Sequence, residues 1–110
     1  MNTGKEKIKG IPFKLEAEVA YAEGSVVSKT LLQSDAGTIT LFSFAAGQGL
    51  SEHTAPYDAT VYILDGEAKI TIGGNPQMVS SGEMLIMPAN VPHSLLAEKQ
   101  FKMLLVMIRG

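Results

Sequence analysis

Apolar and polar residues alternate along short stretches of the chain from residue 24 onward. Ala68, Ile70 and Ile72 alternate with Lys69 and Thr71, the pattern of a strand with one buried face. Gly, Asp and Pro separate these stretches at short intervals, and no stretch has a helical period. The pattern therefore predicts an all-β sandwich or barrel. Strands are expected at residues 25–32, 38–45, 59–64, 68–72, 83–87 and 101–108, and one more is expected to begin at His93.

Turn signals lie between several of these stretches. Asp65-Gly66 stands between two predicted strands, and this dipeptide favours a two-residue hairpin. Residues 73–76 (GGNP) indicate another turn. In residues 38–45 the alternation places Phe42 and Phe44 on one face of the strand, opposite Ile39 and Leu41.

The last predicted strand is apolar on both of its faces. A strand at the wall of a monomeric barrel should have one face in water, so something is expected to cover the outer face. We expect an N-terminal arm at residues 1–24 and a barrel domain at residues 25–110. We predict that a second copy of the chain covers the outer face in a homodimer, because symmetric dimers are the commonest oligomers. The alternative is that the N-terminal arm of the same chain covers it. One face carries Phe101, Met103, Leu105 and Met107, and the other carries Leu104, Val106 and Ile108.

Composition narrows the class of protein. The chain has 110 residues, a formal net charge of −2 and no cysteine. This length suits one domain, and the weak charge bias argues against nucleic-acid binding and against an electrostatic membrane anchor. Without cysteine there is neither a disulfide nor a thiolate metal site. With no early apolar run either, we expect a cytoplasmic protein.

Two stretches carry the two histidines of the chain and match a known pair of motifs. The first motif, G-x5-H-x-H-x3,4-E-x6-G, and the second, G-x5-P-x-G-x2-H-x3-N, are those of the cupins. The chain resembles this family, which implies a double-stranded β-helix, or jelly-roll, barrel. Six of the ten motif positions keep the motif residue. The first motif falls on Gly47, His53, Ala55, Ala59 and Gly66, and the second on Gly82, Pro88, Asn90, His93 and Ala97.

The resemblance also implies a metal site, and this chain departs from it. Cupins typically hold a divalent metal with three histidines and a glutamate, but Ala55 and Ala59 occupy two of those four positions. The chain is thus similar to a small single-domain, RmlC-like cupin with a degenerate metal site. His53 and His93 are the remaining candidate ligands for Mn, Fe, Ni, Cu or Zn, and two ligands predict weak or absent binding. Candidates for a third donor are Glu52, Asp58, Tyr57 and Gln77.

The two histidines are expected to share a pocket. Residues 53, 55 and 59 have the same parity, so a regular strand would point all three into the barrel. Taken singly, each histidine is more often a hydrogen-bonded structural residue. The joint occurrence at both motif positions favours a small-molecule pocket with apolar walls. Its expected lining is His53, His93, Ala55, Ala59, Tyr57 and Met84, with Met87, Met103 and Met107 as further candidate walls.

Three functions are compatible with such a pocket. The first is a binding module for a small molecule, with weak or absent metal. The second is a metal-dependent enzyme of the dioxygenase or isomerase type, as the family resemblance implies. The third is a metal-free epimerase-like enzyme, in which His53 would be the base, Asp58 would orient it and Tyr57 would donate a proton. In that stretch, Tyr57-Asp58 is also an ordinary turn after Pro56.

Overall fold

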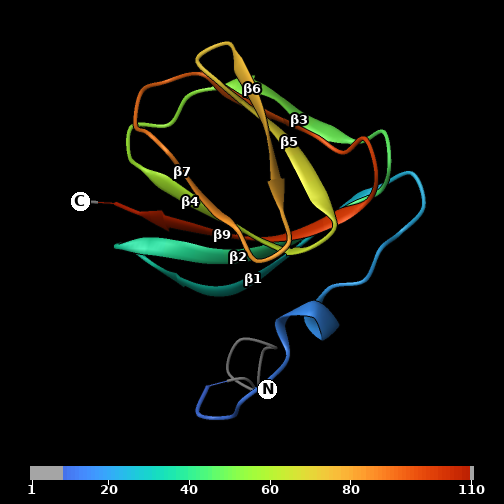
Figure 1. Cartoon of the computed structure of the whole chain (residues 1–110). Helices are drawn as coiled ribbons and strands as arrows, with labels where there is room; N and C mark the ends of the chain where they lie inside the picture. The colour runs from blue at the N-terminus through green and yellow to red at the C-terminus, as the bar shows by residue number, and fades with distance from the viewer. Residues whose placement is uncertain (1–8, 110) are drawn as a thin grey trace.

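The computed structural model describes residues 9–109 of the chain. Over that range the backbone forms one short 3-10 helix and nine β-strands, which wrap into a barrel (Figure 1). The elements are η1 Leu15–Glu18, β1 Val26–Ser34, β2 Gly37–Phe44, β3 Gly49–His53, β4 Ala59–Asp65, β5 Glu67–Ile72, β6 Asn75–Ser80, β7 Met84–Met87, β8 His93–Leu96 and β9 Phe101–Ile108.

Two antiparallel sheets make the walls of the barrel. The five-stranded sheet has the order β1-β2-β9-β4-β7, and the four-stranded sheet has the order β3-β8-β5-β6. Figure 1 shows β3 and β5 lying across the barrel from β2 and β9. Both sheets are built from strands that are distant in sequence, as in a jelly roll. The prediction of an all-β, double-stranded β-helix barrel is confirmed.

The main core fills the space between the two sheets. Phe44 and Phe101 are fully buried, and their rings stack with centroids 4.5 Å apart. Leu41, on the opposite face of β2, belongs to a second apolar cluster outside the barrel. The alternation predicted for this strand therefore decides which side chains enter the barrel and which face outward.

Residues 9–24 pack against the outer face of the five-stranded sheet, below it in Figure 1. Val19 and Leu15 contact the outer cluster that includes Leu41 and Leu104. Polar contacts add to this packing. They are the bond from Ser43 Oγ to the carbonyl oxygen of Ala20 (2.7 Å), the ion pair of Lys29 with Glu18 (2.7 Å), and the bond from the Tyr21 hydroxyl to Asp65 (2.6 Å).

This segment covers only part of the outer face of β9. Leu104 packs against it, whereas Val106 is partly exposed and Ile108 is 68% exposed. Among the residues that the structure describes, the N-terminal segment therefore covers the outer face of β9 near Leu104 but not near Ile108. The alternative to a dimer, cover by the same chain, thus accounts for only part of this face.

Two turn predictions are corrected. Asp65-Gly66 does not close a hairpin, because β4 and β5 belong to different sheets and Gly66 carries the chain between them. Both edges of β4 are already paired, with β7 and β9, so β5 cannot join it. The second turn is confined to the two residues Gly73 and Gly74, after which β6 begins.

Two strands were not predicted, β3 and β6. Gly49 lies inside β3, where the sequence indicated a break, and Pro76 lies inside β6. Proline lacks the N–H that a central strand needs, but β6 is the edge strand of its sheet and tolerates it.

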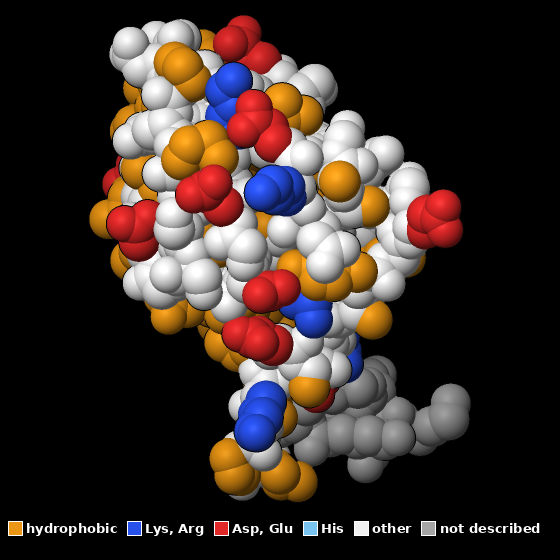
Figure 2. Space-filling model, turned by 45° about the vertical axis from the view of Figure 1, so that its right-hand side comes forward, with side chains coloured by type: hydrophobic (Ala, Val, Ile, Leu, Met, Phe, Trp, Pro, Cys, Tyr) orange, Lys and Arg blue, Asp and Glu red, His pale blue; other side chains and the backbone are white. Residues whose placement is uncertain are grey.

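Within residues 9–109, no helix is long and apolar enough to span a membrane. Figure 2 shows one face of the molecule, on which Lys, Arg, Asp and Glu side chains are interspersed. Among the described residues on that face, the basic side chains do not merge into a patch of the kind that nucleic-acid binders carry.

Candidate functional site

His53 and His93 face each other on neighbouring strands. His53 ends β3 and His93 begins β8, and the two residues are directly paired in the sheet. Their Nε2 atoms are 3.1 Å apart, with ring centroids 4.3 Å apart and the ring planes at 70°. His93 is buried, with 4% of its surface exposed, whereas His53 is exposed. The structure thus brings the two imidazoles together.

A β-bulge directs His53 toward His93. Leu50 pairs with Leu95, and the next pair is His53 with His93, so three steps along β3 match two steps along β8. Leu50 and His53 would face opposite sides of a regular strand, because they are three residues apart. The extra residue of the bulge reverses the alternation and re-aims the side chain. Both residues consequently line the same cavity.

Backbone carbonyls hold the second nitrogen of each ring. Nδ1 of His53 lies 2.8 Å from the carbonyl oxygen of Ser51, and Nδ1 of His93 lies 3.2 Å from that of Val91. A carbonyl oxygen only accepts hydrogen bonds, so the ring nitrogen is the donor in each of these contacts. The two Nε2 atoms are also within hydrogen-bond distance of each other, and in that bond one nitrogen donates and the other accepts.

The loop before His93 is held in place by the segment before β4. Asn90 has a φ of 62°, a left-handed conformation that asparagine tolerates better than most residues. Its N–H donates to the carbonyl oxygen of Ala55 at 2.8 Å, and the N–H of Ala89 donates to Asp58 Oδ1 at 2.8 Å. Both bonds position the start of β8, and with it the His93 ring.

The imidazoles border a cavity of about 180 Å³ between the two sheets. Ala55 and Ala59 line it, as predicted from their parity, and the rest of the lining is apolar. Leu105 shares a strand face with Met103 and Met107, and Leu95 is two residues from His93, so the alternation could have found both. Leu50 depends on the register of the unpredicted strand β3. The remaining lining residues are Leu50, Leu95, Leu105, Met87, Met103 and Met107.

Met84 does not line this cavity. It pairs with Tyr62 across the outer face of the five-stranded sheet and is 60% exposed. In β7 the alternation sends Met87 into the barrel and Met84 outward. The prediction that Met84 belongs to the pocket is therefore corrected, and Met87 takes that place.

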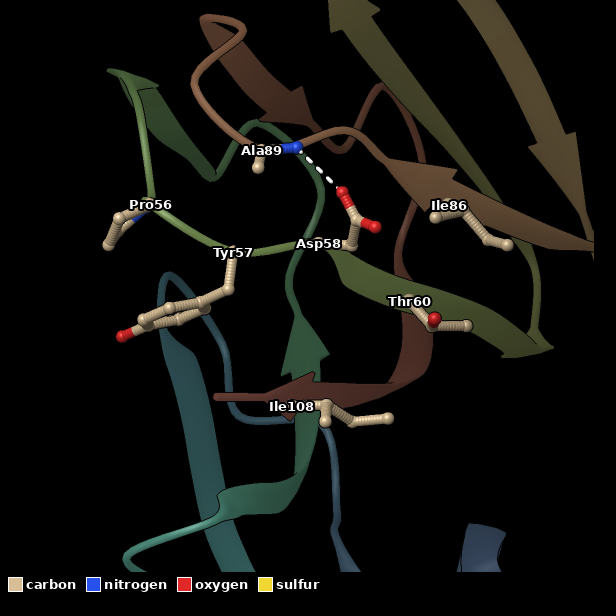
Figure 3. Close-up of a pocket in the computed structure, with 7 residues that line it drawn as sticks. All are labelled: Pro56, Tyr57, Asp58, Thr60, Ile86, Ala89 and Ile108. Carbon is tan, nitrogen blue, oxygen red and sulfur yellow. Dashed lines mark hydrogen bonds between the residues drawn. The ribbon is translucent and has the colours of Figure 1, made fainter. Parts of the chain in front are cut away.

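Tyr57 also lies outside the cavity. It lines a separate hollow of about 500 Å³, and Figure 3 shows it there together with Asp58 and Ile108. Its ring lies under the Arg109 guanidinium, 5.8 Å from the ring centroid. Asp58 points to the N–H of Ala89 (Figure 3). The arrangement of His53, Asp58 and Tyr57 that a metal-free epimerase would need is not assembled.

The family resemblance implies a divalent metal at this site, and the candidate donors are the ring nitrogens of His53 and His93. Two Nε2 atoms 3.1 Å apart can both reach one ion at ordinary metal–nitrogen distances of about 2.0–2.1 Å. Catalytic zinc sites use three protein ligands, and iron oxygenase sites use two histidines and a carboxylate. Residues 9–109 contain no group of three or more His, Cys, Asp or Glu side chains that could hold an ion. The residues present therefore do not fit a resident metal.

Comparison with known proteins identifies relatives of the same fold. A conserved protein of unknown function from Streptococcus pyogenes is 39% identical over 92% of this chain and 89% of its own, with a TM-score of 0.87. A cupin superfamily protein from Desulfitobacterium hafniense is 33% identical over 93% of this chain and 94% of its own, with a TM-score of 0.87.

A third solved structure is longer than this chain. The Cupin 2 conserved barrel domain protein from Leptotrichia buccalis is 44% identical, and the match covers 88% of this chain and 47% of that one, with a TM-score of 0.86. No curated protein matches the sequence. The family model described as the cupin domain matches residues 40–109. The chain therefore belongs to the cupin family.

Proposed function

We propose that the protein binds a small organic molecule in the cavity between its two sheets and that it does so without a resident metal. The observation that carries this proposal is the cavity beside His53 and His93, which has apolar walls and one polar locus. Apolar pockets with a few convergent polar groups are the usual form of a small-molecule site.

The two alanines support binding rather than metal-dependent catalysis. Ala55 and Ala59 stand where the family motif has metal ligands, and both line the cavity. A methyl group offers no lone pair and occupies less space than imidazole or carboxylate. The substitution thus removes donors and enlarges an apolar chamber at the same point. We expect any divalent ion to bind weakly, through His53 and His93 alone.

A fragment screen by ligand-observed NMR tests the proposal. We expect compounds that bind the wild-type chain to lose binding in Ala59→Leu, because Ala59 is 2% exposed and a larger side chain would fill the cavity. Met78→Leu is the matched control, because Met78 is 43% exposed on the other sheet. Binders that persist in Ala59→Leu would place the site elsewhere.

Metal analysis of tag-free protein is the second arm. We expect less than one equivalent of any divalent metal, and no change in melting temperature when metal is added. A stoichiometric metal that disappears in a His53→Ala, His93→Ala double variant would instead favour the metal-dependent enzyme, and would contradict the proposal.

We also propose that two copies of the chain associate through the outer face of the five-stranded sheet. Leu32, Ile39, Val106, Thr60 and Ile86 form one continuous cross-strand row on this face, which we name the outer row. Leu32 is 45% and Ile86 is 58% exposed. Contiguous exposed apolar side chains of this kind commonly mark a surface that binds another protein.

The rim of the outer row supports a second copy as its partner. The hollow beside Ile86 and Ile108 includes Asp58, and Arg109 lies at the same end over Tyr57. A surface with one acid and one base beside an apolar row is complementary to itself under twofold symmetry.

A further inference from the structure

Three parallel rows of residues cross the outer face of the five-stranded sheet, and the outer row is the middle one. Residues two positions away along each strand share this face, so a further row lies on either side of the outer row. We name these two the covered row and the open row. The covered row is Leu41, Leu104 and Tyr62, and the open row is Gly37, Ile108 and, two residues before Thr60, Asp58.

Residues 9–24 form a ridge along the covered row. Leu15 and Val19 pack against this row, and Lys14 borders a hollow together with Tyr62. Figure 1 shows the segment projecting below the sheet, away from the C-terminal end of β9.

The open row is a recess on the other side of the outer row. Ile108 is 68% exposed, and it lines two hollows, of about 240 Å³ and about 500 Å³. Gly37 adds no side chain to this row. The outer face thus has a ridge on one side of the outer row and a recess on the other.

A twofold dimer can join two such faces with its axis along either of two directions. Facing sheets pack with their strands nearly aligned, and the axis then lies between them, in the plane of the interface. An axis along the strands brings the covered row of one copy over that of the other, so the two ridges collide. An axis along the outer row turns the covered row of each copy onto the open row of the other, so each ridge enters a recess.

Charges on the ridge and in the recess agree with the second arrangement. Asp58 and Tyr62 are each two residues from Thr60 of the outer row, so this axis places Tyr62 of the partner subunit opposite Asp58. Lys14 of the partner subunit borders that tyrosine. A lysine therefore meets a carboxylate, and the symmetry makes this contact twice.

We infer that the twofold axis of the dimer runs along the outer row, so that residues 9–24 of each copy seat in the open row of the other. This inference rests on the proposed dimer. It adds the direction of the axis and the occupant of the recess, whereas the proposed dimer requires only that the outer faces meet.

Single-cysteine variants test the direction of the axis, because the chain has no cysteine of its own. Leu32 and Ile86 stand at opposite ends of the outer row. With the axis along that row, each of them faces its own counterpart. We therefore expect Leu32→Cys alone and Ile86→Cys alone to give covalent dimers with a short bis-maleimide, measured on a denaturing gel. Met78→Cys, on the other sheet, is the control and should not be cross-linked.

The cross-linking pattern separates this inference from the proposed dimer. An axis along the strands places β1 opposite β7 of the partner subunit, because β9 is the middle strand of the sheet. Cross-linking only in a mixture of Leu32→Cys and Ile86→Cys chains would thus overturn the inference and leave the proposed dimer standing. Absence of cross-linking in every sample would overturn both.

Charge reversal tests the occupant of the recess. Lys14→Glu and Asp58→Lys should each weaken the dimer by about tenfold, and both changes in one chain should restore most of the affinity, because opposite charges then face each other again. Dissociation constants are measured by analytical ultracentrifugation. Asp58 also accepts a bond from the N–H of Ala89, and Lys14→Glu cannot replace that bond, so recovery reports the contact between copies. A double variant that dimerises as weakly as Asp58→Lys alone would overturn the inference.

Discussion

At the scale of residues, left-handed backbone conformations mark the corners of the barrel. Gly47, Gly66 and Gly82 have φ values of 88°, 77° and 86°, and Asn90 follows with 62°. All four stand at the glycine positions of the two family motifs. Glycine adopts this conformation without strain, and asparagine does so at modest cost. The motif spacing thus has a physical basis in turn geometry that is independent of any metal.

Gly66→Ala should destabilise the fold more than Gly82→Ala. A Cβ at Gly66 would overlap the carbonyl oxygen of Gln100, whereas a Cβ at Gly82 would meet open space. Both variants carry the strain of a positive φ, about 1–2 kcal/mol, and only the first adds a backbone clash. We expect Gly66→Ala to lose at least about 1 kcal/mol more in free energy of unfolding, measured by urea denaturation. Equal losses would show that the contact with Gln100 relaxes freely.

Tyr21 should make the stability of the fold sensitive to alkaline pH. Burial raises the pKa of Tyr21 well above its usual range, and the hydrogen bond to Asp65 and the charges of Asp65 and Glu16 raise it further. The folded state therefore keeps the phenol proton that the unfolded chain releases near pH 10. Its contribution to stability is complete below about pH 10 and is lost as the pH rises above that value.

Thermal melts of wild type and Tyr21→Phe between about pH 9 and about pH 11 test this linkage, because the range extends about one pH unit on either side of the usual tyrosine pKa. We expect the melting temperature of wild type to fall more steeply. Lys102, whose Nζ lies 5.0 Å from the centroid of the Tyr21 ring, is present in both proteins. Parallel curves would contradict the prediction.

At the scale of elements, the bulge in β3 decides whether the pocket has one imidazole or two. The strand places Leu50 toward the cavity, and only the extra residue allows His53 to follow it on the same side. β8 needs no such device, because Leu95 and His93 are two residues apart. The candidate site therefore depends on a local irregularity in one short strand.

Deletion of Glu52 should leave the two histidines together. With the extra residue gone, Leu50 and His53 would be two residues apart on a regular strand, so both side chains would still face the cavity. We expect the NMR cross-peak between the Hε1 protons of the two rings to persist, with the barrel still folded by circular dichroism. Glu52→Ala keeps the bulge and should also keep the cross-peak. Loss of the cross-peak in a folded deletion variant would show that the bulge does not set the direction of the His53 ring.

At the scale of the whole molecule, the two faces of the five-stranded sheet are buried to different extents. The inner face closes the barrel, and residues 9–24 cover the part of the outer face around Leu41 and Leu104. Ile39 of the outer row packs against this covered cluster, whereas Ile86 and Ile108 lie beyond it and are 58% and 68% exposed. The molecule thus has one apolar face that is available for association.

Ile86→Lys should convert a dimer into a monomer. Light scattering of wild type is expected to give twice the chain mass of 11.7 kDa. Ile86→Lys should give the mass of one chain, because burying a lysine in an interface is strongly unfavourable. Met78→Lys on the other sheet is the control and should leave the mass unchanged. A wild-type monomer at micromolar concentration would contradict the proposal.

The sequence by itself determined the strands other than β3 and β6, and it matched both histidines to the motifs of a barrel family. Alternation over short distances is a local property, so it located β2, β4, β5, β7 and β9 and separated Phe44 from Leu41. The motif spacing predicted that His53 and His93 lie together in one pocket. Tertiary structure alone decided the rest: the bulge at β3, the passage from β4 to the other sheet, and the outward position of Tyr57. These features depend on which strand edges are free and on pairing between distant segments, and no local pattern records either one.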